Sequence, residues 1–495
     1  MTTSTTQTPA AGLSARDRNV IITLLIATFV VILNETIMNV ALPRLMVDLD
    51  VSARTGQWLS TAFMLTLAVV IPTTGFLLQR LSTRTVFVLA MSLFSTGTLL
   101  AAVSPAFWLL LPARVVQASG TAVMLPLLMT TILTLVPVER RGVVMGNVSI
   151  AISVAPAIGP TVSGLVLHFF SWRFMFVLVL PIALAALVYG GKRLVNVGER
   201  GSQRIDLLSV LLSVPAFGGV VYGLSQLGAG GDATVPPAAF LAVGVVALLL
   251  FGWRQMRLTR PGNPLLDLRV FRFGMFSLSV ALLCLAMLGL FGVIILLPIY
   301  LQEIRGIGAL QTGLMLLPGG LVMGLLGPQV GRLFDRYGPR GLSVFGAVLL
   351  SLTMWRFSHV DPGTPVWLLI GLHVVMSVAL ACLFTPAFTT GLNPLPPHLY
   401  SHGSAVLTTL QQVAGAAGTA MLVAIYSGKT ASLAARGTAT REAMAGGIQS
   451  AFAVATLFAL VTIVLAAFMR RTGGATSGHG GPAEQVREDE PVRAD

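Results

Sequence analysis

Charged side chains are scarce in this chain. Asp, Glu, Lys and Arg make up 10% of its residues, against about 25% in soluble domains. Hydrophobic residues make up 55%, and the mean hydropathy is +0.86. Apolar runs of about 20 residues, the length of a helix that crosses a bilayer, recur along the whole chain. The composition therefore predicts an all-α integral membrane protein rather than a soluble domain.

Cysteines and the common catalytic motifs are also lacking. The two cysteines, Cys284 and Cys382, lie in apolar runs, where we expect them to pack as small hydrophobic residues. The chain contains no H-E-x-x-H, no G-x-S-x-G and no P-loop G-x-x-x-x-G-K-[ST]. These absences argue against an enzyme and against ATP-driven transport, and we expect no metal and no cofactor. No repeated ring of residues indicates a channel filter.

The apolar runs predict fourteen membrane spans. We place them at 20–42, 57–79, 85–104, 107–132, 142–168, 172–190, 206–228, 237–256, 274–302, 309–333, 340–357, 365–391, 402–427 and 448–469. An even number of spans puts both termini on the same side of the membrane. With that side cytoplasmic, most of the 31 Lys and Arg residues fall inside, as the positive-inside rule requires. The net charge of +13 is then a topology signal and does not indicate nucleic-acid binding. We expect a monomer in a bacterial inner membrane.

Two similar basic loops divide the chain into halves. The segment 75–84 ends the second predicted span, and 331–340 ends the tenth. Such a repeat predicts two homologous six-helix bundles with a site between them near the middle of the membrane. The predicted divisions are a cytoplasmic tail 1–19, a first bundle 20–190, a linker 191–273 with two inserted spans, a second bundle 274–469 and a disordered cytoplasmic tail 470–495.

Glu35 is the only acidic residue that we place deep inside a predicted span. A charge at that depth is costly unless it faces water, a partner or a ligand, so such residues are functional candidates. Asn39 lies one helical turn further on the same face and can hydrogen-bond the carboxyl or a ligand. Arg114 is the only basic residue predicted in a span interior, and Gln117 lies one turn from it. Together they predict a polar site, although each of them can also serve packing alone.

Several segments resemble signatures of the major facilitator superfamily. They are the first-span segment 33–43 with Thr36, Asn39, Ala41, Leu42 and Pro43; the loop 331–340 with Asp335, Arg336, Gly338 and Arg340; the fourth-span segment with Arg114, Gln117 and Gly120; and the fifth-span segment 155–164 with Gly159, Pro160 and Gly164. More narrowly, the chain looks like the 14-span drug:H⁺ antiporter family, which includes multidrug and lincomycin exporters of bacteria. The resemblance covers residues 18–470.

Three positions depart from the family pattern. Asn34 stands where the family has an aspartate, and the carboxyl appears one residue later at Glu35, about 100° around the helix. Gln79 stands where the first loop has an aspartate, and Ser82 where it has a glycine. The loop motif is therefore complete only in the second half.

The resemblance implies a proton-coupled antiporter that exports amphiphilic drugs by alternating access. Glu35 and Arg114 are the predicted proton-coupling residues. The predicted substrate contacts are Glu35, Asn39, Gln117, Gln411 and Gln412, and the predicted gating residues are Gly159, Pro160, Gly164, Asp335, Arg336, Gly338 and Arg340. One acid in a mostly apolar cavity suits monocations or neutral lipophilic compounds. An uptake carrier of the same superfamily, or an exporter of one endogenous metabolite, stays open as an alternative.

Overall fold

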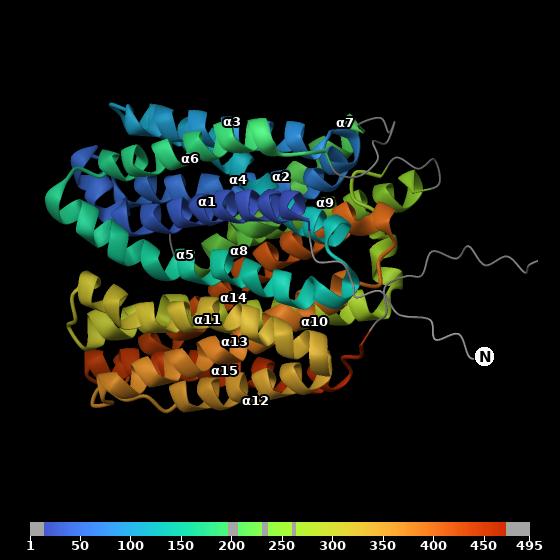
Figure 1. Cartoon of the computed structure of the whole chain (residues 1–495). Coiled ribbons are helices and arrows are strands. Elements are labelled where there is room, and N and C mark those ends of the chain that lie inside the picture. Colours follow the sequence, from blue (N-terminus) through green and yellow to red (C-terminus); the bar gives the residue numbers. More distant parts are fainter. Residues whose placement is uncertain (1–13, 197–205, 230–235, 260–263, 472–495) are drawn as a thin grey trace, which may run out of the picture.

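The computed structural model describes residues 14–196, 206–229, 236–259 and 264–471. Within these ranges the regular elements are helices, and no strand occurs. Most of them run along a common direction in one bundle (Figure 1). α1 begins and α15 ends at the same end of that bundle (Figure 1). We call this the inner end, since the positive-inside rule predicts that it faces the cytoplasm. The predicted tail 470–495 lies almost entirely outside the described residues.

Six helices form the first half of the chain. They are α1 (Ala15–Asp48), α2 (Ala53–Arg80), α3 (Thr83–Ala102), α4 (Phe107–Leu135), α5 (Arg141–Phe169) and α6 (Arg173–Arg193). The first three begin with serine caps, because Ser14, Ser52 and Ser82 each accept a hydrogen bond from the backbone N–H three residues further on. Ser82 replaces the motif glycine, so this departure from the family pattern serves the start of α3.

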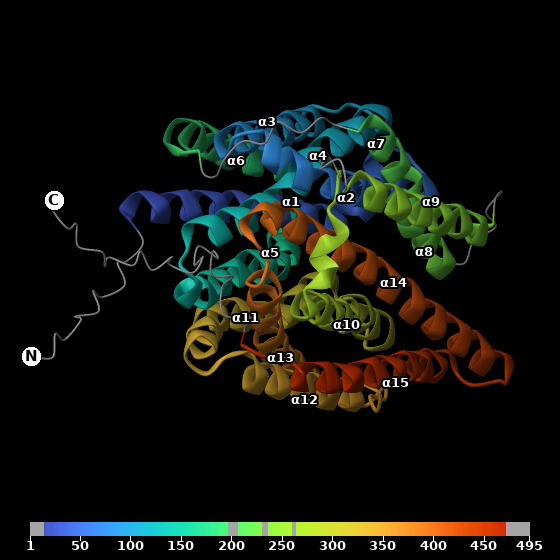
Figure 2. The same ribbon diagram turned by 90° about the vertical axis from the view of Figure 1, so that its right-hand side faces the viewer.

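The inserted helices and the second half follow. The insertion consists of α7 (Leu207–Ser213), the π-helical turn η2 (Val214–Gly218), α8 (Gly219–Ala229) and α9 (Pro237–Leu258). The second half consists of α10 (Gly274–Ile299), η4 (Tyr300–Ile304), α11 (Ala309–Tyr337), α12 (Pro339–Phe357), α13 (Val366–Leu392), α14 (Tyr400–Ala435) and α15 (Thr440–Ala467). Short 3-10 turns, η1 (Val138–Arg140), η3 (Leu268–Arg272) and η5 (Pro397–Leu399), precede α5, α10 and α14. The inserted helices lie to one side of both halves (Figure 2).

Thirteen helical segments of the described chain are long and apolar enough to cross a membrane. The predicted eleventh span, 340–357, is helical in α12 but does not belong to this set. A multi-pass all-helical membrane protein is therefore confirmed, whereas fourteen crossings stay a prediction.

α5 and α11 make the most extensive helix-to-helix contact, and they belong to different halves. Glycines let the two backbones touch, as is common where helices pack inside a membrane. A Cβ atom on Gly327 would clash with the carbonyl oxygen of Gly146, and one on Gly331 would clash with that of Gly142. The contact continues to the outer end, where Gly164 faces α11.

α2 and α14 form a second contact between the halves. Near the inner end Gly75 lies against His402, and a Cβ atom on this glycine would come within 2.8 Å of the imidazole Nδ1. α8 packs against both α14 and α2, so the inserted helices lie along this side of the interface (Figure 2).

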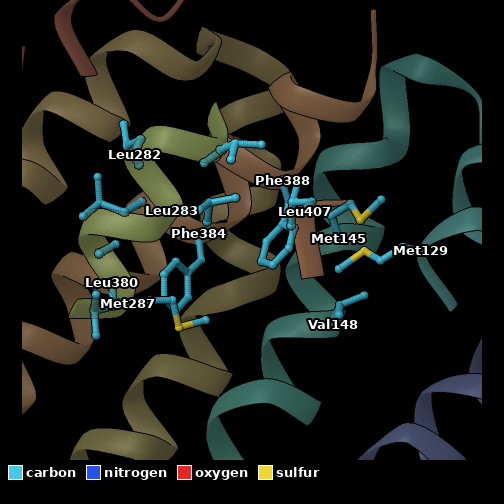
Figure 3. Close-up of a cluster of buried hydrophobic side chains, with 14 of the residues drawn as sticks. Met129, Met145, Val148, Leu282, Leu283, Met287, Leu380, Phe384, Phe388 and Leu407 are labelled. Carbon is cyan, nitrogen blue, oxygen red and sulfur yellow. The ribbon is translucent and has the colours of Figure 1, made fainter. Parts of the chain in front are cut away.

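A buried apolar layer also joins the halves. Met129, Met145 and Val148 of α4 and α5 meet side chains of the second half in Figure 3. The latter come from α10, α13 and α14 and include Leu282, Leu283, Met287, Leu380, Phe384, Phe388 and Leu407. All of them belong to one cluster of buried hydrophobic residues. The two halves thus share a core that excludes water from this part of their interface.

We expect Gly327→Leu to destabilise the protein, because the added side chain meets the backbone of α5 at Gly146. Overpacking of this kind costs about 1–3 kcal/mol. The measurement is the apparent melting temperature of the detergent-solubilised protein. Gly252→Leu is the control, since a Cβ atom there meets nothing within 4 Å. An equal decrease of the melting temperature in the two variants would contradict a tight contact at Gly327.

Candidate functional site

Arg114 is held inside the first half by neutral partners. The residue is 1% exposed, and its guanidinium lies 4.1 Å from the ring centre of Phe63 on α2. Its Nη1 donates to Oε1 of Gln117 and, over 3.5 Å, to Oδ1 of Asn34 on α1. Gln117 in turn donates to Oγ1 of Thr98 on α3 over 2.8 Å. We call these five residues the Arg114 cluster, to which four helices contribute.

Glu35 lies beside the Arg114 cluster without being paired to it. The residue is half-buried and interacts electrostatically with Arg114. No ion pair or hydrogen bond joins its carboxyl to another side chain among the described residues, whose three ion pairs lie elsewhere. Nε of Arg114 also has no partner there. The carboxyl can therefore bind or release a proton, and Arg114 has an unused N–H to offer to the charged form.

The structure brings Glu35, Arg114 and Gln117 into one region of the first half, although their roles stay predictions. Sequence reasoning singled out Asn34 only as a departure from the family pattern, yet its amide oxygen is an acceptor for Arg114. An amide at this position holds the guanidinium without adding a second negative charge beside Glu35. The side chain of Asn39 lies outside the described residues.

The two glutamines of α14 differ in their surroundings. Gln411 is 4% exposed, and its Nε2 has no hydrogen-bond partner in the described part of the chain. Gln412 is half-buried. No hydrogen bond joins either of them to the Arg114 cluster within the described ranges. A buried amide donor without a partner is unusual and is available to a ligand.

Gly159 and Pro160 of α5 face different helices. A Cβ atom on Gly159 would clash with Oγ1 of Thr36, the residue after Glu35 on α1. Pro160 instead lies against Gly313 of α11. Gly159 therefore sets the distance between α5 and α1 inside the first half, while Pro160 borders the second half. Any gating role of these residues stays a prediction.

Asp335 joins the halves at the inner end. Its carboxylate oxygens accept hydrogen bonds from the backbone N–H groups of Gly142 and Val143, over 2.9 and 3.0 Å. These groups belong to the first turn of α5, where a negative charge is favoured by the unpaired N–H groups and the helix dipole. Among the described residues no arginine forms an ion pair with Asp335. The motif aspartate therefore acts on a helix end rather than on the arginines beside it.

Gln79 is the counterpart of Asp335 in the first half, but it donates a hydrogen bond to the other half, whereas Asp335 accepts hydrogen bonds. Its Nε2 donates to the backbone carbonyl of His398, just before α14, over 2.7 Å. Its Oε1 has no partner in the described structure. At the contact between α2 and α14, Gln79 thus occupies the motif position. It carries no charge, and it donates a hydrogen bond where the motif aspartate accepts one.

Arg141 is a residue of the inner end that sequence reasoning missed. It is 5% exposed and begins α5, where it donates to the carbonyls of Val136 and Leu133 over 3.0 and 2.6 Å. The same guanidinium donates to Oδ1 of Asn393 and the hydroxyl of Tyr400 in the second half, over 3.1 and 3.3 Å. In the sequence it is one of two adjacent arginines outside a predicted span, so nothing marked it as buried.

The other motif residues of the second loop have local roles in the structure. Gly338 adopts φ +81° between α11 and α12, a conformation that favours glycine. The guanidinium of Arg336 lies 5.2 Å from the ring centre of the adjacent Tyr337. Arg340 is exposed in the first turn of α12. Gly338 therefore shapes the turn that follows Asp335, and the two arginines supply charge at the inner end.

These features define a class of protein. A bundle of long apolar helices, with two halves that meet along α5–α11 and α2–α14 and with buried charge inside, is a multi-pass membrane transporter. The chain belongs to the Major Facilitator Superfamily, whose family model matches residues 24–419. Its relatives include proteins named for lincomycin resistance and for multidrug resistance.

Three similar proteins illustrate this relation. The uncharacterized MFS-type transporter YcnB of Bacillus subtilis (strain 168) is 42% identical over 92% of this chain and 96% of its own length. The lincomycin resistance protein LmrB of the same organism is 40% identical over 91% of this chain and 95% of its own. The crystal structure of the human organic anion transporter MFSD10 covers 91% of this chain and 99% of its own at 16% identity, with a TM-score of 0.63. That likeness concerns the fold alone.

We expect Asp335→Asn to weaken the contact between the halves at the inner end, because the asparagine amide can accept only through one oxygen and carries no charge. A charge at a helix N-terminus contributes about 1 kcal/mol, so the open population should rise about fivefold. The measurement is the maleimide labelling rate of Thr385→Cys in a background without Cys284 and Cys382. Thr385 is fully buried, and its Oγ1 lies 3.1 Å from Oγ of Ser149 across the interface between the halves.

The matched control is Arg332→Gln, which removes a charge from an exposed side chain one turn before Asp335. Its labelling rate should equal that of the parent protein. An unchanged rate in Asp335→Asn, or an equal rise in both variants, would show that Asp335 does not hold the inner end closed.

Proposed function

We propose that this protein is a proton-coupled antiporter that exports amphiphilic drugs across a bacterial inner membrane by alternating access. The observation that carries the proposal is the half-buried carboxyl of Glu35 beside Arg114, in a helix that crosses the membrane. In this proposal the first and second halves move as units, both termini are cytoplasmic and the protein acts as a monomer.

The carboxyl of Glu35 takes up a proton from the outside and gives it to the inside. Arg114 attracts the charged form and so favours release, while Asn34 and Gln117 hold the guanidinium when the carboxyl is neutral. Substrate and proton then compete for the charged carboxyl, which couples drug export to proton entry. Arg114 does not need to change its own protonation for this exchange.

Alternation requires that the inner end can close and open. Asp335, Gln79 and Arg141 each bridge the halves there through side-chain hydrogen bonds. Such bonds contribute about 1 kcal/mol each net of water, so a few of them can bias a two-state equilibrium and still be broken in each cycle. While these bonds are broken, the glycine contact between α5 and α11 keeps the halves together.

The surroundings of Glu35 support lipophilic substrates with at most one positive charge. A single carboxyl can balance one cation, and the unpartnered Nε2 of Gln411 can donate a hydrogen bond to a polar group of the substrate. The relatives named for lincomycin resistance and for multidrug resistance support small antibiotics as the substrate class.

We expect Glu35→Gln to reduce drug efflux driven by a pH gradient to the rate measured without the gradient, because the amide cannot carry a proton. Glu35→Asp should keep part of the activity with a shifted pH profile. The measurement is the transport of lincomycin and of a lipophilic monocation in inverted membrane vesicles under an imposed pH gradient.

Glu303→Gln is the matched control, since it neutralises an exposed carboxyl in η4 at the outer end. It should transport like the parent protein. Gradient-driven efflux at the parental rate in Glu35→Gln would overturn the coupling role of Glu35. Net accumulation of the drugs in intact cells expressing the protein would favour an uptake carrier, and resistance to no tested drug would favour a metabolite exporter.

A further inference from the structure

His373 is a partly buried histidine of α13 that the proposed transport cycle does not use. Its Nε2 lies 3.2 Å from the carbonyl oxygen of Leu316 on α11. A carbonyl can only accept a hydrogen bond, so this contact assigns the ring proton to Nε2 and leaves Nδ1 as an acceptor. Nδ1 is buried and has no hydrogen-bond partner in the described part of the chain. A buried acceptor without a partner is costly and needs an explanation.

A glycine of α11 makes room for this imidazole. A Cβ atom on Gly319 would clash with Cδ2 of His373. The next residue, Gly320, faces Ala157 of α5 in the first half. The hydroxyl of Ser377, one turn further along α13, donates to the backbone carbonyl of His373 over 2.9 Å and does not reach Nδ1. The imidazole therefore lies close to the contact between the halves with one nitrogen unused.

His373 occupies the position in the second half that Arg114 occupies in the first. Arg114 stands seven residues after Phe107, where α4 begins, and His373 stands seven residues after Val366, where α13 begins. Both helices run from the outer to the inner end, so each side chain starts about 10 Å from the outer end of its helix. The two halves thus carry a nitrogen-bearing side chain at the same depth.

The residues against which these two side chains pack are also equivalent. Phe63, whose ring faces Arg114, stands ten residues after the start of α2, and Gly319 stands ten residues after the start of α11. The same register aligns Gln79 with Asp335. The first half therefore has an arginine on a phenylalanine where the second half has a histidine beside a glycine.

The acid of the first half and this histidine lie at a similar depth. Thr36, which follows that acid on α1, faces Gly159 of α5. Ala157 of the same helix faces Gly320, which follows the glycine beside the imidazole. Both contacts fall within one turn of α5. A substrate held between the halves near the acid is therefore at the level of the histidine as well.

A neutral acceptor suits this position better than a group that binds a proton. An imidazolium ion inside the membrane needs a counter-charge, and no carboxylate forms an ion pair with the ring among the described residues. A hydrogen bond from a hydroxyl or an N–H group satisfies Nδ1 without adding a charge. The unused nitrogen thus matches a donor group of a bound molecule.

We propose that His373 is a substrate-binding residue of the second half, whose Nδ1 accepts a hydrogen bond from a hydroxyl or N–H group of the drug. Glu35 balances the positive charge from the first half, so the two halves recognise different features of one substrate. Nδ1 is covered in this structure, and the substrate reaches it in another arrangement of the halves. The inference rests on the proposed export of amphiphilic drugs but does not require proton coupling.

The test compares two permanent monocations that differ in their hydrogen-bond donors. Ethidium carries two amino groups, whereas tetraphenylphosphonium has no N–H and no O–H group. The dissociation constant of each cation is measured by equilibrium dialysis against the detergent-solubilised full-length protein, at one fixed pH and without a gradient. Because the charge of the two cations is the same, the ratio of their constants reports on the donor groups.

We expect His373→Leu to weaken ethidium binding about tenfold, as the loss of one hydrogen bond does, and to leave tetraphenylphosphonium binding unchanged. His373→Gln should keep most of the affinity for ethidium, since its amide offers a donor for the carbonyl of Leu316 and an acceptor for the drug. Gly319→Ala keeps every polar group but displaces the ring, so it should also weaken ethidium binding alone. If His373→Leu does not purify as a folded protein, Gly319→Ala decides the matter.

His359→Leu is the matched control, because it removes an exposed histidine at the outer end of the second half. It should bind both cations like the parent protein. An unchanged ratio of the two constants in His373→Leu and Gly319→Ala, or an equal change of the ratio in His359→Leu, would overturn the inference.

Glu35→Gln separates this inference from the proposed function. It should weaken the binding of both cations alike, because both carry one positive charge. Parental binding of both cations in Glu35→Gln would overturn the role of Glu35 and leave that of His373 standing. A parent protein that binds neither cation would overturn the proposed substrate class and this inference with it.

Discussion

The contact between α5 and α11 is the constraint on which the rest of the structure depends. At Gly146, Gly327 and Gly331 the nearest atoms across the contact are backbone atoms of the facing helix, so the halves approach closely there. This proximity brings the carboxylate of Asp335 within hydrogen-bond reach of the first turn of α5. A larger residue at any of these glycines would part the halves and remove that bond as well.

Ion pairs do not join the two halves within the described residues. The three that occur there, Arg44–Asp48, Arg254–Asp206 and Arg269–Asp267, are local to one helix, the insertion and one turn. The halves are joined by glycine contacts, an apolar layer and side-chain bonds to helix ends. Each bond of the last kind contributes about 1 kcal/mol, in keeping with an interface that must close and open.

Buried charge is arranged differently in the two functional regions. In the first half, Nη1 of Arg114 donates to the amide oxygens of Asn34 and Gln117, while Glu35 forms no ion pair among the described residues. At the inner end, Asp335 is satisfied by backbone N–H groups. The first arrangement keeps a carboxyl available for a proton, whereas the second uses a carboxylate to connect helices. The surroundings of each acid, and not its residue type, decide its role.

Much of the fold was predictable, because a membrane span needs about 20 apolar residues and nothing else competes with that signal. The helix positions follow from that pattern, whereas the superfamily was indicated by the resemblance of motif residues in segments such as 331–340 and 155–164. Glu35 and Arg114 were found because a charge in an apolar run is conspicuous. Arg141 was not, since it stands next to another arginine at a predicted boundary and only the structure shows that it is buried.

The sequence by itself determined the class of protein, the span pattern and the identity of the few charges inside it, since these depend on composition along one helix at a time. Only the tertiary structure decided what each residue contacts. It placed Gly159 against α1, brought the carboxylate of Asp335 to the first turn of α5, and joined Arg141 to Asn393 of the second half. The physical reason is that such contacts join helices far apart in the chain, so they depend on how the helices pack, which no local pattern encodes.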